Sequence, residues 1–376
     1  MCVRTHLNCV RKHGKTHEKF VKHTGNIRIK DIARMAGVSV GTVDRVLHNR
    51  GKVSADAFAK VDEVLKNINY KPNLIARSLG KGRKQRIVVL IPNPVSDPYW
   101  QEVHQGIKQA EEEWAHYGTV IETRFYVHDG DEALERVAME TLNTNPDGLV
   151  MAPIFHPQAM PVITMLREQG TPYVLINTNI PESEPLSFIG QDLFQSGKLA
   201  GRLMSIGKGD SDRFAILHIG EDIKDSVYLM EKETGFRAYF DDCKTTRNKI
   251  DSHNLNQDTE PIPNQISKIL DNELLKGIYV TTSKALALVA CVLAGHQRKS
   301  EVQLIGYDML EENLQYLKQN IITFLINQNP KRQSFVGISH MANHLLFKRT
   351  VAATELFPLE IITQQNLDSY LSSSIH

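Results

Sequence analysis

The sequence predicts two structural parts: a small all-α head at the N-terminus and a larger C-terminal α/β body with parallel sheets in two lobes. Three short helical patterns occupy residues 27–69, and from Ile87 onward short apolar runs alternate with helical stretches. Residues 1–86 hold 20 Lys and Arg against 6 Asp and Glu, whereas the remainder holds 24 against 37. A basic head on an acidic body is typical of a head that contacts a polyanion, although a merely solvated basic terminus carries the same charge.

The composition excludes several classes of protein. With 376 residues, of which 41% are hydrophobic and 23% charged, the chain has the composition of a soluble globular protein of two or three domains. No apolar run approaches the ~18–20 residues that span a bilayer, and the first 25 residues lack the apolar core of a signal peptide. The four cysteines are too scattered for a disulfide framework. We therefore expect a cytoplasmic protein with no membrane partner.

The head begins with two predicted helices, Ile29–Ala36 and Val40–His48, joined by a tight turn. Gly37 can adopt the left-handed conformation that ends the first helix, and Ser39 is placed to cap the second, with Thr42 at its third position. A third helix follows, whose apolar stripe is Phe58, Val61, Val64, Leu65 and Ile68. Two helices around a Gly turn, with a polar outer face on the second, are typical of a DNA-reading helix-turn-helix.

The outer face of the second helix supplies the predicted base contacts. Arg45 can form a bidentate contact to a guanine edge in the major groove, or else contact a phosphate or solvent. Asp44 can accept from a cytosine amino group, or pair with Arg45 or solvent. Basic residues around the first helix are expected to position the head on phosphates. The predicted DNA-contacting residues of the head are Arg28, Ile29, Lys30, Ser39, Val40, Gly41, Thr42, Asp44, Arg45 and His48, and Arg34 is a further phosphate contact.

The segment after the third helix is predicted as a short hinge helix. Pro72 fits a first helical position, but the eight residues up to Leu79 are too few for a helix that is stable alone in water. We expect it to order only between a partner copy and DNA, with Leu79 as a wedge between base steps in the minor groove and Ala76 as a close-approach residue. Asn73 and Arg77 complete the predicted contacts. The alternative is an ordinary linker.

The body is predicted to have a parallel α/β architecture, because its strand candidates are uninterrupted apolar runs, as expected where both faces of a sheet are covered. Eight strands exceed one small sheet, which predicts two lobes, and the ligand crevice of such sheets lies beyond the carboxyl ends of the strands. The strand candidates are Ile87–Ile91, Val120–Val127, Gly148–Ala152, Tyr173–Asn177, Phe214–His218, Gly277–Thr281, Val302–Tyr307 and Ile321–Leu325. Helices between them include Tyr99–Tyr117, Glu132–Leu142, Leu193–Met204 and Ser283–Ala294.

These residues carry a resemblance to a known family. Asp31-Ile-Ala33, Ala36-Gly-Val-Ser39, Thr42-Val-Asp-Arg-Val46, Val53-Ser54 and the run from Tyr70 to Leu79 resemble the head and hinge of the lactose-repressor (LacI/GalR) transcription factors. The body is similar to that family's regulatory domain, a two-lobed fold like periplasmic ribose-binding proteins, so the resemblance spans residues 27–365. One departure is that the second helix opens with Val40 and Gly41 rather than large polar side chains, so base reading there is expected to be apolar or absent.

The resemblance implies an organisation and partners. Residues 1–26 are expected as a basic flexible extension, 27–69 as the helix-turn-helix domain, 70–86 as hinge helix and linker, and 87–376 as a two-lobed effector-binding and dimerisation domain. The implied partners are palindromic operator DNA, a second copy in a homodimer or a dimer of dimers, and a small effector that alters operator affinity.

The resemblance also implies effector contacts in the first lobe. Asp97-Pro-Tyr-Trp100 is similar to the Asn-Pro-Phe-Phe loop of ribose-binding proteins, whose aromatic rings stack on the sugar. Tyr99 is the better stacking candidate because Trp100 falls on the apolar stripe of its helix and can be plain core. Asp97 can simply cap that helix. Asn177 aligns with a sugar-binding carboxylate, and Thr178 replaces an arginine, which favours a ligand other than ribose.

In the second lobe, Lys232 stands where a sugar-contacting Arg is expected and Thr282 where those proteins present an Asn, although either residue can be ordinary surface. Asp308 ends a strand at the predicted crevice and can bind ligand, or cap a helix with Glu311 three residues later. Gln328 matches an amide at a crossover between the lobes. Aromatic rings with amides and a carboxylate suit a polyhydroxylated ligand, because each buried hydroxyl needs a partner.

No sequence signature of an enzyme or a metal site argues against the prediction of a regulator. Cys2, Cys9, His13 and His17 fit no zinc-finger spacing, and no phosphate-binding loop or catalytic constellation occurs, so we expect no cofactor and no enzymatic activity. The sequence favours a transcription regulator controlled by a sugar-like effector. The alternative is a cytoplasmic sugar sensor that acts through a protein partner, with a non-specific basic head. A binding protein for transport is disfavoured by the head and by the lack of a signal peptide.

Overall fold

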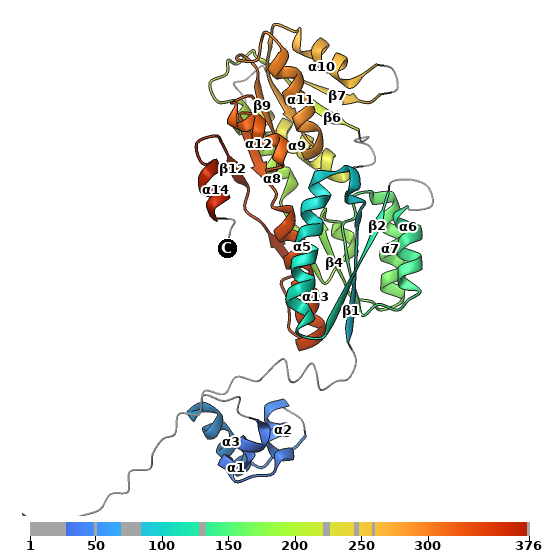
Figure 1. Cartoon of the computed structure of the whole chain (residues 1–376), viewed down its shortest axis with the longest axis vertical. Coiled ribbons are helices and arrows are strands. Elements are labelled where there is room, and N and C mark those ends of the chain that lie inside the picture. Colours follow the sequence, from blue (N-terminus) through green and yellow to red (C-terminus); the bar gives the residue numbers. More distant parts are fainter. Residues whose placement is uncertain are drawn as a thin grey trace, which may run out of the picture. The chain divides into compact units, whose positions relative to one another are not determined.

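The computed structural model describes residues 28–48, 51–68, 84–127, 133–220, 226–243, 248–257 and 260–373. The chain divides into two compact units, Met1–Leu74 and Ile75–His376, which we describe separately as the head and the body (Figure 1). The predicted hinge contacts Asn73, Ala76, Arg77 and Leu79 lie outside the described residues, as does the Cys2–His17 stretch.

The head consists of the helices α1 (Ile29–Ala36), α2 (Val40–His48) and α3 (Ala55–Asn67). Gly37 ends α1 with a φ of 64°, and its backbone N–H donates to the carbonyl of Ala33, as the turn chemistry predicts. The fully or nearly buried core residues are Ile32, Ala33, Ala36, Val43 and Val61. Phe58 does not belong to this core: 47% of it is exposed, because it lies in the first turn of α3, before the part of the helix that packs on α1 and α2.

The body contains two six-stranded sheets with matching strand orders, β11-β5-β4-β3-β1-β2 in lobe 1 and β12-β10-β9-β8-β6-β7 in lobe 2. Neighbouring strands run parallel except β10 and β12. The shared order makes the lobes two copies of one architecture, which no repeat in the sequence reveals. In both lobes the carboxyl ends of the strands are the edge where ligands bind in such sheets.

In lobe 1, α13 packs beside α5 on one face of the sheet, and α6 and α7 lie on the opposite side of the lobe (Figure 1). Its elements are β1 (Gln85–Pro92), η1 (Pro94–Ser96), α5 (Pro98–Ala115), β2 (Thr119–Tyr126), α6 (Leu134–Leu142), β3 (Gly148–Met151), α7 (His156–Glu168), β4 (Tyr173–Asn177), η3 (Pro181–Ser183), β5 (Ser187–Gly190), α13 (Pro330–Phe347) and β11 (Thr354–Leu356).

Lobe 2 takes up the middle of the chain and its C-terminal end. Its elements are α8 (Leu193–Met204), β6 (Arg213–Ile219), α9 (Val227–Asp242), β7 (Lys249–Leu255), α10 (Ile262–Leu270), β8 (Leu275–Val280), α11 (Ser283–Gly295), β9 (Gln303–Tyr307), α12 (Glu311–Lys318), β10 (Phe324–Asn327), β12 (Glu360–Ile362) and α14 (Leu367–Ser373).

Three crossovers therefore join the lobes. The chain passes from β5 to α8 through Gln191 and Asp192, from β10 to α13 through Gln328 and Asn329, and from β11 to β12 through residues 357–359. A parallel α/β unit with this connectivity can bind a ligand between lobes that move about the crossovers.

The strand candidates correspond to β1, β2, β3, β4, β6, β8, β9 and β10, with one clear error of position. The predicted strand Ile321–Leu325 begins only at Phe324, because Asn320 adopts a φ of 58° and the backbone N–H groups of Ile321 and Ile322 donate to Tyr316. These residues close the end of α12 instead of joining the sheet. The strands β5, β7, β11 and β12 are too short or too polar to show as apolar runs.

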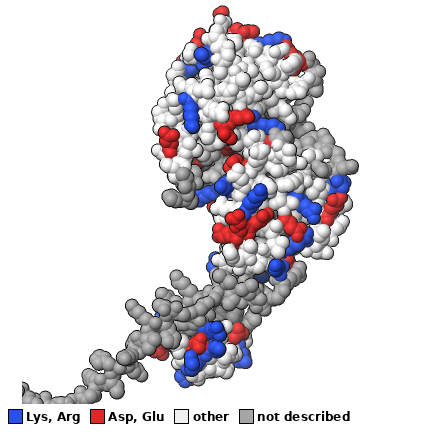
Figure 2. All heavy atoms as spheres, in the orientation of Figure 1, with Lys and Arg blue, Asp and Glu red and all other residues white. Residues whose placement is uncertain are grey.

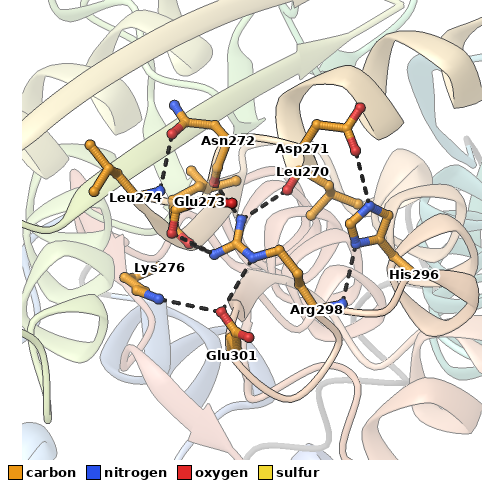
Figure 3. A network of polar contacts seen from close by, with 10 residues as sticks. Leu270, Asp271, Asn272, Glu273, Leu274, Lys276, His296, Arg298 and Glu301 are labelled. Atoms are coloured by element: carbon orange, nitrogen blue, oxygen red, sulfur yellow. Dashed lines mark hydrogen bonds and ion pairs between the residues drawn. The ribbon is translucent and has the colours of Figure 1, made fainter.

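Arg298 stabilises lobe 2 at the amino-terminal edge of its sheet (Figure 3). Its guanidinium is nearly buried and donates to the carbonyls of Leu270 (2.9 Å), Glu273 (3.0 Å) and Leu275 (2.6 Å), and also to that of Asn272. Five N–H donors in a rigid fork suit such a cluster of carbonyls. The turn between α10 and β8 is thus held by one cation.

Candidate functional site

The outer face of α2 presents the side chains that the sequence predicts for base contacts. Val40 is 52% exposed, Gly41 and Arg45 are exposed, and Asp44 is half-buried, whereas Val43 faces the core. Nothing lies closer than 3.8 Å to a Cβ placed on Gly41, so the backbone there is open to a close approach. The side chain of His48 lies outside the described residues.

The hydroxyls of Ser39 and Thr42 are engaged at the start of α2. Ser39 Oγ accepts from the backbone N–H of Thr42 (3.1 Å), and the two hydroxyl oxygens are 2.9 Å apart. Ile29, which we predict as a DNA contact, packs half-buried against the head core, so its side chain is not an outward group.

The positive charge of the described head is modest. Seven Lys and Arg stand against five Asp and Glu in residues 28–48 and 51–68. Arg34 pairs with Asp31 at 2.9 Å, whereas Lys30 and Arg45 form no ion pair with another described residue. Figure 2 shows Lys and Arg side chains on the visible face of the head beside a few acidic ones. Most of the basic excess of residues 1–86 therefore belongs to segments outside the described residues.

A cavity of about 410 Å³ lies between the two lobes of the body. Its walls carry aromatic rings, amide, hydroxyl and charged groups, and several Ile and Leu side chains. Seven of the eight predicted effector residues line it, namely Asp97, Tyr99, Trp100, Asn177, Lys232, Thr282 and Gln328, and Asp308 does not. Further lining residues that the sequence does not single out include Ile154, Ile219, Tyr228, Ile262, Lys284 and Leu288.

In the lobe 1 wall, α5 begins with a carboxylate cap. Asp97 accepts a hydrogen bond from the backbone N–H of Tyr99 (3.0 Å), and burial raises the pKa of Asp97. Asp97 thus caps the helix and also lines the cavity, and its contact with an effector stays a prediction. Trp100 likewise belongs to the lobe 1 core and to the cavity wall. Its ring meets that of Tyr99 edge-on, with centroids 5.0 Å apart.

Asn177 ends β4 in a left-handed conformation, with a φ of 69°. Its Nδ2 donates to the hydroxyl of Tyr99 (2.6 Å), and its Oδ1 accepts from Thr178 (2.9 Å). The Tyr99 oxygen is the acceptor in this bond, so its own hydrogen takes no part in it. Burial raises the pKa of Tyr99 well above its ordinary value, so it stays a neutral donor.

In the lobe 2 wall, Lys232 is 2% exposed, which differs from the exposed position that a lysine usually takes. Its Nζ donates to the carbonyl of Thr281 (3.1 Å) and lies 3.6 Å from the centroid of the Tyr307 ring. The lysine is held there because α9 crosses α8 with backbones in contact. A Cβ on Gly235 would lie 1.9 Å from the carbonyl oxygen of Phe194, so only glycine fits.

Behind Lys232 lies a buried network that the sequence does not indicate. His218 Nδ1 is 2.9 Å from Thr281 Oγ1, and His218 Nε2 is 2.7 Å from Glu233 Oε2. Burial alone would raise the pKa of Glu233, but hydrogen bonds with His218, Ser252 and Arg237 lower it to about 2. Consecutive residues of α9 thus face two ways, Lys232 toward the cavity and Glu233 toward β6 and β7.

Asp308 acts differently from our expectation that it binds ligand or caps a helix. It is 1% exposed with a φ of 63°, and α12 is instead preceded by Leu310 as its N-cap. Its carboxylate accepts from the Gln328 backbone N–H (2.7 Å), from Gln328 Nε2 (2.6 Å) and from the hydroxyl of Ser283. Burial raises the pKa of Asp308. Asp308 therefore orients Gln328 and Ser283, which do line the cavity.

Thr282 lines the cavity just before α11, but its hydroxyl does not cap that helix. Its Oγ1 is shielded from solvent and has no hydrogen-bond partner in the described structure. A direct ligand contact with this oxygen would need the side chain to rotate. An unpaired buried hydroxyl costs about 1–3 kcal/mol, which a ligand hydroxyl or the helix N-terminus can recover after rotation.

The cavity can bind a molecule with several hydroxyl groups and an apolar face. Tyr99, Trp100 and Tyr228 offer ring surfaces, while Lys232, Gln328 and Ser283 offer hydrogen-bonding groups. Among the described residues, no cluster of His, Cys, Asp and Glu has the arrangement of a metal site. In the same part of the chain, no helix is both long and apolar enough to cross a membrane.

Two family models match the chain. Residues 28–73 match bacterial regulatory proteins of the lacI family, and residues 87–349 match the periplasmic binding protein domain. The sucrose operon repressor of Streptococcus mutans is 25% identical over 326 residues, covering 86% of this chain and 92% of that protein. The regulator MalR of Streptococcus pneumoniae is 30% identical over 175 residues, which cover 46% of this chain and 51% of MalR. That alignment thus spans about half the length of MalR.

Solved structures share the fold of the body. A structure described as a LacI transcriptional regulator from Bacteroides fragilis superposes with a TM-score of 0.71 at 28% identity, covering 77% of this chain and all of that chain. GanP, a glucose-galactose binding protein from Geobacillus stearothermophilus, has the same fold, with a TM-score of 0.66 at 20% identity over 76% of this chain and 99% of its own. With its helix-turn-helix head and its two-lobed body, this chain belongs to the lacI family of bacterial regulatory proteins and carries a periplasmic binding protein domain.

Proposed function

We propose that this protein is a transcription regulator of the cytoplasm, whose affinity for a palindromic operator is controlled by a sugar-like effector bound between the lobes of the body. The observation that carries the effector half is the cavity itself. It joins ring surfaces from lobe 1 to hydrogen-bonding groups from lobe 2 and the crossover, so its occupant contacts both lobes at once. A ligand held by both lobes favours the lobe arrangement in which both sets of contacts are made.

The DNA half rests on the exposed outer face of α2. In this proposal two copies form a homodimer and place two α2 helices in successive major grooves, with Arg45 at a guanine edge. Glycine and valine at the start of α2 leave the other base contacts apolar or absent. The hinge segments order between the two copies on the operator. Effector and operator must then change each other's affinity by the same factor, because the two equilibria are linked.

Selection of bound sequences from a random duplex library, at physiological salt and with the full chain, tests the DNA half. We expect a palindromic consensus with a flexible pyrimidine–purine step at its centre. Binding without a consensus, lost steeply as salt rises, would contradict sequence-specific regulation and favour a sugar sensor whose basic head only anchors it to polyanions.

Titration of a sugar panel into the operator complex tests the effector half, with fluorescence anisotropy of the labelled operator as readout. A sugar that changes operator affinity should lose its effect in Lys232→Met, which removes a buried cavity-lining cation. Lys318→Met, at an exposed lysine on α12, is the matched control and should respond as the wild type does. If Lys232→Met responds to the sugar with unchanged midpoint, the effector binds elsewhere.

A further inference from the structure

One buried glutamine connects all three crossovers between the lobes. Gln191 follows β5 in the first crossover and is 3% exposed. Its Nε2 donates to the carbonyl of Asn327 (2.9 Å), where the second crossover begins, and to the carbonyl of Pro358 (2.7 Å) in the third. Both partners are carbonyl oxygens, so the atom that faces them must be the amide nitrogen, and both of its hydrogens are used.

The neighbouring bonds are local by comparison. The backbone N–H of Phe357 donates to Gly190 (2.7 Å) on the lobe 1 side, and Asn327 Nδ2 donates to Glu360 (2.8 Å) on the lobe 2 side. Each of these joins two crossovers at one end. Only the amide of Gln191 contacts both of the other crossovers near the middle of the hinge, among the described residues.

The same side chain carries an unsatisfied group. Gln191 Oε1 is buried and has no hydrogen-bond partner in the described structure. A buried acceptor without a donor is destabilising, and persists only where the rest of the site compensates for it. If the lobes rotate about the crossovers, the Nε2 bonds can break and Oε1 can meet other donors or water.

We propose that Gln191 is a positioning residue of the hinge, whose amide holds the three crossovers in the lobe arrangement seen here and so sets the balance between two lobe arrangements. In one arrangement both Nε2 bonds are made and Oε1 is unpaired, and in the other the reverse holds. This inference builds on the proposed function, in which lobe arrangement controls operator affinity. Gln191 itself is not among the residues that line the cavity.

The test compares Gln191→Met with Gln265→Met. Methionine keeps the length of the side chain and removes both donors. Gln265 is a matched control within lobe 2, because its Nε2 also donates to two carbonyls, those of Asn256 (2.6 Å) and Glu260 (2.7 Å). Both variants therefore lose two bonds from a side-chain amide to backbone carbonyls, but only one loses them at the hinge.

The distance between lobes is the first readout and needs neither effector nor operator. Spin labels are attached at Glu168→Cys on α7 of lobe 1 and at the exposed Cys291 on α11 of lobe 2, after replacement of Cys2, Cys9 and Cys243 by serine. Double electron–electron resonance should show a shifted or second distance population in Gln191→Met and the wild-type distribution in Gln265→Met. Superimposable distributions for Gln191→Met and the wild type would overturn the proposal.

Operator affinity of the folded protein is the second readout, which a merely structural role would not move. We expect Gln191→Met to change the effector-free operator Kd by about fivefold, because the arrangement seen here loses two hydrogen bonds whereas the other loses only that of Oε1. Gln265→Met should match the wild type. An unchanged Kd beside a shifted distance population would refute the control of operator affinity by Gln191. Failure of the wild type to select any operator would instead refute the proposed function, while the distance readout still decides whether Gln191 holds the hinge.

Discussion

Replacement of Gly235 by alanine tests the close crossing of α8 and α9 that places Lys232 in the cavity wall. An added Cβ would lie 1.9 Å from the Phe194 carbonyl oxygen, whereas real Cβ atoms essentially never come within 3.0 Å of such an atom. The helices must therefore separate by at least about 1 Å. Overpacking of this kind costs about 1–3 kcal/mol, and because the obstacle is backbone we expect the upper part of that range. The higher helix propensity of alanine returns at most ~1 kcal/mol.

The net expectation is a loss of about 2 kcal/mol in the free energy of unfolding, or ~4–8 °C in melting temperature for a domain of about this size. Circular dichroism at increasing urea measures it on the full chain, since both tryptophans lie in lobe 1 and report less directly on α9. Gly295→Ala is the matched control, because this glycine ends α11 and a Cβ there meets nothing within 4 Å. We expect Gly295→Ala to be neutral or slightly stabilising. If Gly235→Ala unfolds at the wild-type midpoint, the helices are not in backbone contact.

Three further predictions concern single side chains. Arg298→Met should lower the free energy of unfolding by about 3 kcal/mol or more in urea denaturation, because four carbonyl oxygens lose a charged donor. The control Lys276→Met removes one exposed ion pair with Glu301 and should cost less than ~1 kcal/mol. Equal losses in the two variants would contradict the stabilising role of Arg298. The pKa of Glu233 in the folded protein is about 2, below its ordinary 4.5, so its contribution to stability is complete above about pH 4.5 and is lost as the pH falls toward 2. The urea midpoints of the wild type and Glu233→Gln should therefore converge as the pH is lowered. A difference that stays constant with pH would be inconsistent with an ionised Glu233. Arg45→Met should weaken operator binding about tenfold or more while changing binding to random DNA much less. The control is Lys60→Met, which removes an exposed ion pair with Asp56 on α3 and should leave both affinities unchanged. Equal losses on both DNAs would make Arg45 a phosphate contact.

Most of the cavity wall was proposed through the resemblance to ribose-binding proteins, and the ends of the strands explain why those positions come together. Asn177 comes directly after an apolar run, whereas one polar residue separates Thr282 and Gln328 from such runs. The carboxyl ends of parallel strands meet at one edge of a sheet. Asp97 and Trp100 were proposed from the similarity of their loop to that of ribose-binding proteins, and the local sequence adds only that a helix starts there. The sequence could not decide whether Asp97 is a helix cap or part of the cavity wall, or whether Trp100 belongs to the core or to that wall. Helical spacing alone does not show which neighbour covers a face of the helix.

The roles of Asp308, Lys232 and Gln191 required the folded structure. Each depends on atoms distant in the chain: the carboxylate of Asp308 meets Gln328, the ammonium of Lys232 meets Tyr307, and the amide of Gln191 meets two other crossovers. A lysine on a helix or a glutamine after a strand can be ordinary surface, so the local sequence does not reveal which distant atoms these side chains meet.

The sequence by itself determined the helix-turn-helix head, the parallel α/β body and the division into lobes, because helix caps, turn glycines and apolar runs are local signals that act within a few residues. The tertiary structure alone decided which polar side chains are buried and paired, where α8 and α9 touch, and how the three crossovers are joined. The physical reason is that burial and hydrogen-bond pairing depend on distances between segments 100 or more residues apart, such as Gln191 and Asn327, and those distances exist only once the sheets have packed.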